Sequence, residues 1–327
     1  MGSYSDPAAS GNPGIARVPS SDSDLKLLVM SRDAVARWLL IAIIGTVDWI
    51  WMARAGFHVG AGFLQSLGVI CALSLIGLFY CLTNRDDRIM RFAHFAAQYL
   101  SLFAVMMPLS YLAVSTDAPL VDPVFDAMDK AMGLDWIAWK AWVVAHPVFQ
   151  CGLRVAYDSL PVQTLIAYIY NVHTRGSWRN NQIWWITFFS ALVTIGVSAM
   201  FPAVNPHVYY GLAGADDFLH MQHLLGLRAG TMHAINFIGA QGLVQLPSFH
   251  TILAIMLIYN FRHNRWLLIA ALLLNTALIL SCPTEGSHYF VDLLAGAVVV
   301  AATILGIRAF ERQFARRSLA VITAAAR

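Results

Sequence analysis

Apolar residues are grouped along this chain into eight long runs, which are separated by polar segments. Each run is close to the roughly 20 residues that cross the hydrocarbon core of a bilayer as a helix. A backbone inside lipid must satisfy its own hydrogen bonds, so the runs are expected to be helices. The pattern predicts an all-α, polytopic membrane helix bundle, with about eight spans at residues 38–56, 61–83, 92–114, 148–171, 182–203, 248–262, 264–282 and 287–309.

The composition agrees with this pattern. Of 327 residues, 58% are apolar and 12% are charged, whereas a soluble domain has about 45–50% and about 25%. This balance excludes a disordered chain and a typical cytosolic enzyme. The net charge of +3 gives no basic surface, so a nucleic-acid partner is excluded. The four cysteines form no CxxC pair, which excludes a zinc ribbon and a redox motif, and we expect no metal and no cofactor.

The positions of Lys and Arg indicate which segments face the cytoplasm. If the N-terminal tail is cytoplasmic, sixteen of the 21 Lys and Arg residues fall on the inner side and four on the outer side. This bias follows the positive-inside rule and predicts that both termini are cytoplasmic. The excess of Arg (18) over Lys (three) favours a GC-rich bacterial genome, so the expected location is an inner membrane with the periplasm outside.

Two polar clusters stand at the outer ends of predicted spans, where ionisable residues are candidates for a functional site. Ser248 suits the N-cap of one span and places His250 in its first turn. His288 and Asp292 open the last span and are four residues apart, so they share a helix face. A carboxylate in that position fixes the tautomer of a histidine and stabilises its charged form. Both clusters are predicted on the same side of the membrane.

Two histidines, one carboxylate and two helix N-termini suit in-line phosphoryl transfer without a metal ion. One imidazole attacks phosphorus, and the other protonates the leaving oxygen. Helix N-termini attract anions through their free N–H groups and the helix dipole. These N–H groups, together with Arg, would hold the equatorial oxygens. The simpler interpretation is that both histidines are interfacial side chains satisfied by their neighbours.

The same residues resemble the second and third motifs of the type-2 phosphatidic acid phosphatase superfamily. The run Pro-Ser-Phe-His ends at His250, and 38 residues later a His-Tyr-Phe-Val-Asp run begins at His288. This second run and the small residues after it are most similar to the inositolphosphorylceramide synthase branch. The resemblance covers about residues 150–310 and implies a six-helix core whose site opens to the outer face.

The resemblance also implies a role for each residue. His288 would be the nucleophile that forms a phosphohistidine, and Asp292 would orient it. His250 would protonate the leaving group, and Ser248 would help to hold the phosphate. The implied activity is metal-independent lipid phosphotransfer between membrane lipids, from a phospholipid or lipid phosphate donor to a lipid or polyol acceptor. A lipid phosphate phosphatase, acting on phosphatidate or polyprenyl pyrophosphate, is the alternative within the same superfamily.

The cations of the phosphatase branch are mostly missing here. Cys282 stands where that branch has the Arg of its third motif, and the first motif, Lys followed by Arg-Pro, is absent. This departure favours the synthase-like branch and requires other residues to bind phosphate. The candidates on the outer side are Arg154, Arg228, Tyr157 and Tyr289. The simpler interpretations are an ion pair between Arg154 and Asp158, four residues on, and a solvated loop charge at Arg228.

A transporter is the alternative from another class of protein. It would use Asp48, Arg154 and Asp158 as a relay, because ionisable residues within spans are costly unless they are used. The chain has no inverted repeat and no pair of broken helices, which transporters often show. Cys151 and Cys282 both lie near the outer face, so a disulfide between them is a further alternative.

A zinc site is the third alternative. His220 and His223 are three residues apart on a predicted outer segment and could share a helix face. Together with His288 or Asp292 they could then make a zinc site. No HExxH-like pattern supports this site. The oligomeric state is left open by the sequence.

The predicted organisation follows from the spans and the clusters. It is a disordered cytoplasmic tail (1–36), N-terminal transmembrane helices (37–115), an amphipathic helix on the outer surface (116–147), a catalytic transmembrane core (148–310) and a cytoplasmic tail (311–327).

Overall fold

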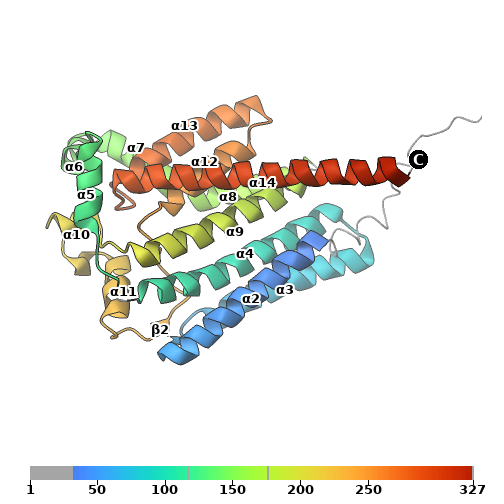
Figure 1. The fold of residues 1–327 in the computed structure, drawn as a ribbon, viewed down its shortest axis with the longest axis horizontal. Coiled ribbons are helices and arrows are strands. Elements are labelled where there is room, and N and C mark those ends of the chain that lie inside the picture. The colour runs from blue at the N-terminus through green and yellow to red at the C-terminus, as the bar shows by residue number, and fades with distance from the viewer. Residues whose placement is uncertain (1–31, 117, 175–176, 326–327) are drawn as a thin grey trace, which may run out of the picture.

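The computed structural model describes residues 32–116, 118–174 and 177–325, so most of the predicted tail 1–36 lies outside the described residues. The described chain is nearly all helical, as predicted (Figure 1). Its α-helices are α2 (Arg32–Ala55), α3 (Phe63–Thr83), α4 (Asp87–Val114), α5 (Asp122–Ala131), α6 (Trp136–Ala145), α7 (Pro147–Asp158), α8 (Leu160–His173), α9 (Ser177–Met200), α10 (Pro206–Tyr209), α11 (Leu219–Arg228), α12 (Phe249–Asn260), α13 (Arg265–Ser281) and α14 (Phe290–Ala325). The shorter elements are β1 (His58–Val59), η1 (Ala215–Asp217) and β2 (Ala234–Ile235).

Seven of the eight predicted spans each coincide with a single helix in the structure. Within the described residues, five helices are long and apolar enough to cross a membrane, namely α2, α3, α4, α9 and α14. The spans predicted at 248–262 and 264–282 are the shorter apolar helices α12 and α13.

The fourth predicted span, 148–171, differs from the expectation because it is divided into α7 and α8 at Ser159. Pro161 lies in the first turn of α8. A proline has no N–H to donate to the carbonyl four residues earlier, and its ring crowds that carbonyl. The break therefore has a local cause in the sequence.

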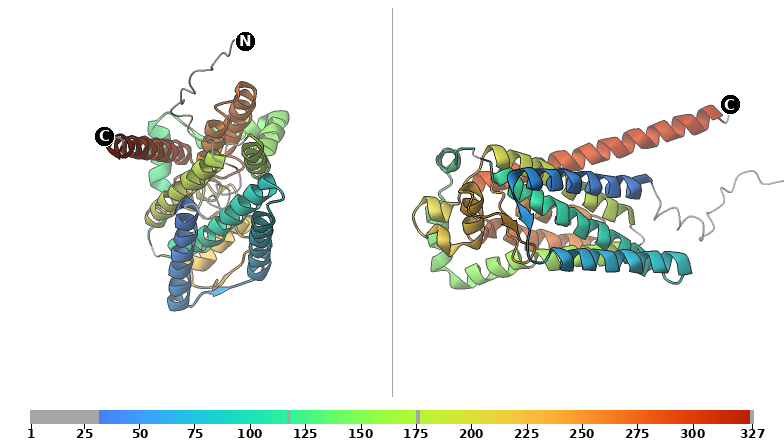
Figure 2. Two further views of the ribbon diagram at one scale, coloured as in Figure 1. Left: turned by 90° about the vertical axis from the view of Figure 1, so that its right-hand side faces the viewer. Right: turned by 90° about the horizontal axis from the view of Figure 1, so that it is seen from below.

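Six helices pack as one unit that will hold the candidate site. In this unit α12 packs against α8, α9, α13 and α14, and α13 packs against α7. The N-terminal helices form a second layer, in which α4 packs against α2, α3 and α9. Figure 2 shows α9 of the six-helix unit beside α4 of the N-terminal layer, and these two helices are in contact.

The short helices gather at one end of the bundle. Figure 1 shows α5, α6, α10 and α11 at the left, while the C-terminal end of α14 extends beyond the bundle at the right. At the same left-hand end, His58–Val59 pairs in parallel with Ala234–Ile235, which ties the loop after α2 to the loop before α12. The segments predicted to face outward therefore lie together.

The prediction of a single amphipathic helix over 116–147 is wrong in detail. Two helices, α5 and α6, replace it, and Gly133 between them adopts the left-handed conformation (φ 74°) that glycine tolerates best. The polar face of α5 is turned inward, because Asp122, Asp126 and Asp129 are all buried. Two apolar residues of α5, Val124 (54%) and Met128 (45%), are exposed instead, whereas Phe125 is buried.

Candidate functional site

His288 and Asp292 form the centre of a buried polar network at the start of α14. The Nδ1 atom of His288 lies 3.1 Å from Oδ2 of Asp292, and both side chains are almost inaccessible to solvent. The same Oδ2 accepts hydrogen bonds from the Nε2 amide of Gln245 (2.9 Å) and from the backbone N–H of Tyr289 (2.9 Å). A carboxylate at Nδ1 holds the proton there, so Nε2 carries the free lone pair. Burial lowers the pKa of His288, in the turn before α14, to about 4, which favours the neutral imidazole.

His250 faces His288 from the first turn of α12. Their ring centroids are 6.4 Å apart. The His250 ring is stacked on Tyr157 of α7, with centroids 4.5 Å apart, and the Tyr157 hydroxyl lies 3.5 Å from Nδ1 of His250. The two histidines predicted from the motifs are therefore close neighbours, and Tyr157 is part of the same group.

Ser248 joins α12 to α14. Its backbone N–H donates to the carbonyl of Asp292 at 2.9 Å, and its hydroxyl accepts from the backbone N–H of Thr251 as an N-cap. The side chain is completely buried. The predicted cap is confirmed, and in this structure the Ser248 hydroxyl also accepts from the Thr251 hydroxyl at 3.2 Å.

Gly296 allows the backbones of these two helices to approach closely. A Cβ atom placed on Gly296 would lie 2.6 Å from the carbonyl oxygen of Ser248 and 3.2 Å from Cβ of Thr251. Real Cβ atoms do not approach a carbonyl so closely, so only glycine fits here. The small residues that follow the His-Tyr-Phe-Val-Asp run thus set the spacing between His250 and His288.

We expect a Gly296→Ala variant to lose activity by roughly 100-fold, because it pushes α12 away from α14 and a shift of about 1 Å has that effect on aligned catalytic groups. The control is Gly306→Ala on the same helix, where an added Cβ meets nothing within 4 Å. That variant should keep full activity. The measurement is the rate of phosphoryl transfer by each purified, folded variant. Equal rates for both variants would contradict the packing argument.

Two aspartates of α5 support the start of α14. The carboxylate of Asp129 accepts from the backbone N–H groups of Phe290 (2.9 Å) and Val291 (2.8 Å). Asp122 accepts from the Tyr289 hydroxyl at 2.8 Å and also from the backbone of Val204. Burial raises the pKa of both carboxyl groups. The first N–H groups of α14 are therefore occupied by Asp129, and the expectation that they hold phosphate is not met.

Tyr289 does not point toward the two histidines. Its side chain is completely buried, and its hydroxyl is bound to Asp122. Its ring also contacts Phe125 of α5. The sequence placed Tyr289 among the phosphate-binding candidates, and the structure instead gives it the position of a core residue that fixes the His288 turn against α5.

A Tyr289→Phe variant should therefore lose stability and keep its substrate affinity. Removing a hydroxyl that hydrogen-bonds a buried carboxylate costs about 1–3 kcal/mol. We expect a lower thermal midpoint in detergent and an unchanged KM. A KM raised tenfold or more at an unchanged thermal midpoint would show that Tyr289 contacts the substrate after all.

The two candidate arginines have other partners. Arg154 pairs with Glu285, at 3.2 Å from Nε to Oε2, so the ion pair expected with Asp158 is wrong. Glu285 lies in the turn that carries His288. The sequence analysis did not identify Glu285 as a partner of Arg154. The Arg154 side chain is 70% exposed, so it remains near the turn without being enclosed. Arg228 donates to the backbone carbonyls of Thr116 (3.0 Å) and Ala118 (2.6 Å), which anchors the loop before α5.

The residues of the zinc alternative have separate partners. His220 lies 3.2 Å from the side-chain amide of Asn205, and His223 lies 2.9 Å from the Tyr111 hydroxyl. In the part of the chain that the structure describes, no group of three or more His, Cys, Asp or Glu side chains is arranged to hold a metal ion. The zinc site that joined these histidines to His288 or Asp292 is therefore not formed.

The disulfide alternative and the relay alternative are not supported either. Cys151 is an exposed thiol and Cys282 a buried one, and both are free. Asp48 lies on α2, which packs against α4, whereas Arg154 and Asp158 lie on α7, which packs against α13. The three residues of the proposed transport relay are thus carried by different parts of the bundle.

Comparison with known protein families places the described site inside a matched region. The family model described as the PAP2 superfamily matches residues 125–306, which is more than half of the chain. The match includes His250, His288 and Asp292 and leaves out α2, α3 and α4. No curated protein and no solved structure matches the chain.

Proposed function

Since the chain belongs to the PAP2 superfamily, whose members are phosphatases and phosphotransferases, we propose that it is an integral-membrane lipid phosphotransferase. The membership and the membrane-span helices support a phosphatase-type function in the membrane. The finer proposal is transfer of a phosphoryl group between lipid head groups at the outer face. Its donor is a phospholipid or lipid phosphate, and its acceptor is a lipid or polyol hydroxyl.

One observation carries this proposal, which is the pairing of His250 with a His288 side chain held by Asp292. In the first step, Nε2 of His288 forms a bond to phosphorus while the ester bond to the leaving oxygen breaks. The proton for that oxygen comes from His250, which acts as the general acid. The product is a phosphohistidine whose ring charge is compensated by the Asp292 carboxylate.

The second step regenerates the enzyme. The acceptor hydroxyl gives its proton to His250, its oxygen bonds to phosphorus, and the bond from phosphorus to Nε2 of His288 breaks. The nucleophile, the acid and the orienting carboxylate are all side chains of this chain, so we propose that the reaction needs no metal. Arg154, on the rim beside Glu285, is the cation best placed to reach a substrate phosphate, since its side chain is 70% exposed.

A lipid panel tests the proposal. Purified protein in detergent is offered phosphatidate, phospholipids and polyprenyl pyrophosphate, each with and without polyol, ceramide or diacylglycerol. Free phosphate and new phospholipid are measured in the same tube. New phospholipid that depends on an added acceptor supports the transferase, whereas release of phosphate alone would replace it with a lipid phosphate phosphatase. Absence of both products across the panel would overturn the proposed function.

A further inference from the structure

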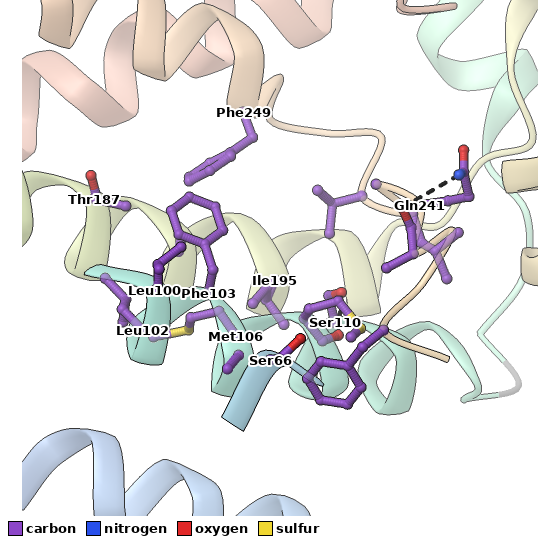
Figure 3. A pocket seen from close by; sticks show the side chains of 18 of the residues that line it. Ser66, Leu100, Leu102, Phe103, Met106, Ser110, Thr187, Ile195, Gln241 and Phe249 are labelled. Atoms are coloured by element: carbon purple, nitrogen blue, oxygen red, sulfur yellow. Dashed lines mark hydrogen bonds between the residues drawn. The ribbon is translucent and has the colours of Figure 1, made fainter. Parts of the chain in front are cut away.

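A cavity of about 530 Å³ lies beside the candidate site, between the N-terminal helices and α9. Its walls come from α3, α4, α9, the segment 237–244 that precedes α12, and Phe249 at the start of α12. Figure 3 shows Phe249 at one end, close to Leu100 and Phe103, and Gln241 at another. The volume is within the range of about 300–1,000 Å³ that is typical of ligand pockets. Two of its walls, α3 and α4, lie outside the residues that match the family.

The lining is mainly hydrocarbon. Side chains such as Phe103, Met106 and Ile195 face the cavity, and polar groups are few. One of them is unusual, because the Thr194 hydroxyl is buried and has no hydrogen-bond partner among the described residues. A buried hydroxyl without a partner is unfavourable, and a ligand oxygen or nitrogen can supply the missing hydrogen bond.

The cavity is connected to the catalytic residues through the segment that precedes α12. Residues 240–244 line the cavity, and the next residue, Gln245, donates to the Asp292 carboxylate at 2.9 Å. Phe249 lines the cavity too, and it stands in sequence between Ser248 and His250. A hydrocarbon chain of a ligand that fills this cavity therefore ends at the polypeptide segment that positions the two histidines.

The cavity also has a wall that faces the surroundings of the bundle. Val69 of α3 lines the cavity and is 52% exposed, and Leu100 of α4 lines it and is 40% exposed. Helix α3 packs against α4, and few of its side chains are buried. In a membrane these surfaces face lipid, so a hydrocarbon chain can reach the cavity from the bilayer without crossing water.

We propose that this cavity binds a hydrocarbon chain of the lipid whose head group reacts at His288. The inference rests on the proposed function and adds a site formed largely by the N-terminal helices. The walls match a long acyl or prenyl chain, and the Thr194 hydroxyl matches an ester, amide or hydroxyl group on it. The bound hydrocarbon chain belongs to either the donor lipid or the acceptor lipid, and the kinetic experiment distinguishes these two sources.

The kinetic experiment uses variants that fill the cavity. Ala191→Phe and Ala104→Phe place a ring in the cavity from α9 and α4. We expect each to raise KM at least tenfold for the lipid whose chain occupies the cavity, and to leave KM unchanged for its short-chain analogue. Long and short chains are varied separately on donor and acceptor. The matched control is Val193→Phe, on the lipid-facing side of α9 (44% exposed), which should leave both KM values unchanged.

A binding experiment keeps the inference testable if the proposed activity fails. The His288→Ala protein is placed in lipid nanodiscs that contain a phospholipid with a photoactivatable diazirine on its acyl chain. After irradiation, the labelled peptides are mapped by mass spectrometry. We expect label on the cavity-lining parts of α4 and α9, and loss of that label in Ala191→Phe. Label confined to exposed helix faces, or label unchanged by cavity filling, would overturn the inference whatever the enzyme turns over.

Discussion

A His288→Ala enzyme is expected to lose phosphoryl transfer by about 10⁴-fold or more, the range seen when a covalent nucleophile is removed. The physical reason is that Nε2 of His288 is the atom that bonds to phosphorus. Among the described residues of the site, the ring of His288 is the one that the buried Asp292 carboxylate holds in a fixed tautomer. The measurement is the rate of product formation from the lipid donor that gives the highest turnover in wild type.

Correct folding of the variant must be shown independently. His288→Gln fills a similar volume and keeps a donor within reach of Asp292, so it should unfold near the wild-type temperature and remain inactive. If His288→Ala and His288→Gln both retained turnover within tenfold of wild type, His288 would not be the nucleophile and the proposed mechanism would be wrong.

The second large effect is expected for Asp292→Asn, which should slow the reaction by about 10²- to 10³-fold, the usual cost of one preorganised electrostatic contact. Asp292 Oδ2 accepts from His288, Gln245 and the Tyr289 backbone. An asparagine oxygen can occupy the same place and accept the same three hydrogen bonds. The variant therefore keeps the geometry and removes the negative charge that compensates the phosphohistidine ring.

The control is Asp158→Asn, which neutralises an exposed carboxylate on the neighbouring helix α7. Its rate should stay within twofold of wild type. The comparison is made on kcat at saturating donor and acceptor, with thermal unfolding as the check on folding. Asp292→Asn at the wild-type rate would remove the orienting role of the carboxylate. An equal loss of rate in Asp158→Asn would show that the loss in Asp292→Asn is not specific to the carboxylate that holds His288.

The sequence predicted the centre of the candidate site because its features are local. An N-cap and a histidine in the next turn are read directly from Ser248 and His250. A spacing of four residues places His288 and Asp292 on one helix face, as the 3.1 Å contact between them shows. That the two clusters meet could be expected from the topology, since both begin helices on the same side of the membrane.

The support of the site could not be predicted in the same way, because it depends on contacts between distant parts of the chain. Asp129 caps α14 across 161 residues, and Asp122 binds the Tyr289 hydroxyl across 167. The acidic face of α5 resembled a solvated face in the sequence, whereas the structure turns it inward. For Arg154, a local partner four residues away was the natural expectation, and the distant Glu285 is the actual partner.

The central claim of this account is a covalent phosphohistidine on His288, and it is tested most directly by trapping that species. Wild-type protein is mixed with a lipid donor labelled with ³²P at the transferred phosphate and is quenched in alkali during turnover. Phosphohistidine survives alkali, so the labelled peptide can be isolated and the modified atom assigned by mass spectrometry. The account predicts label on His288 and none in His288→Ala. Turnover with no trapped label, or with label on another residue, would contradict it.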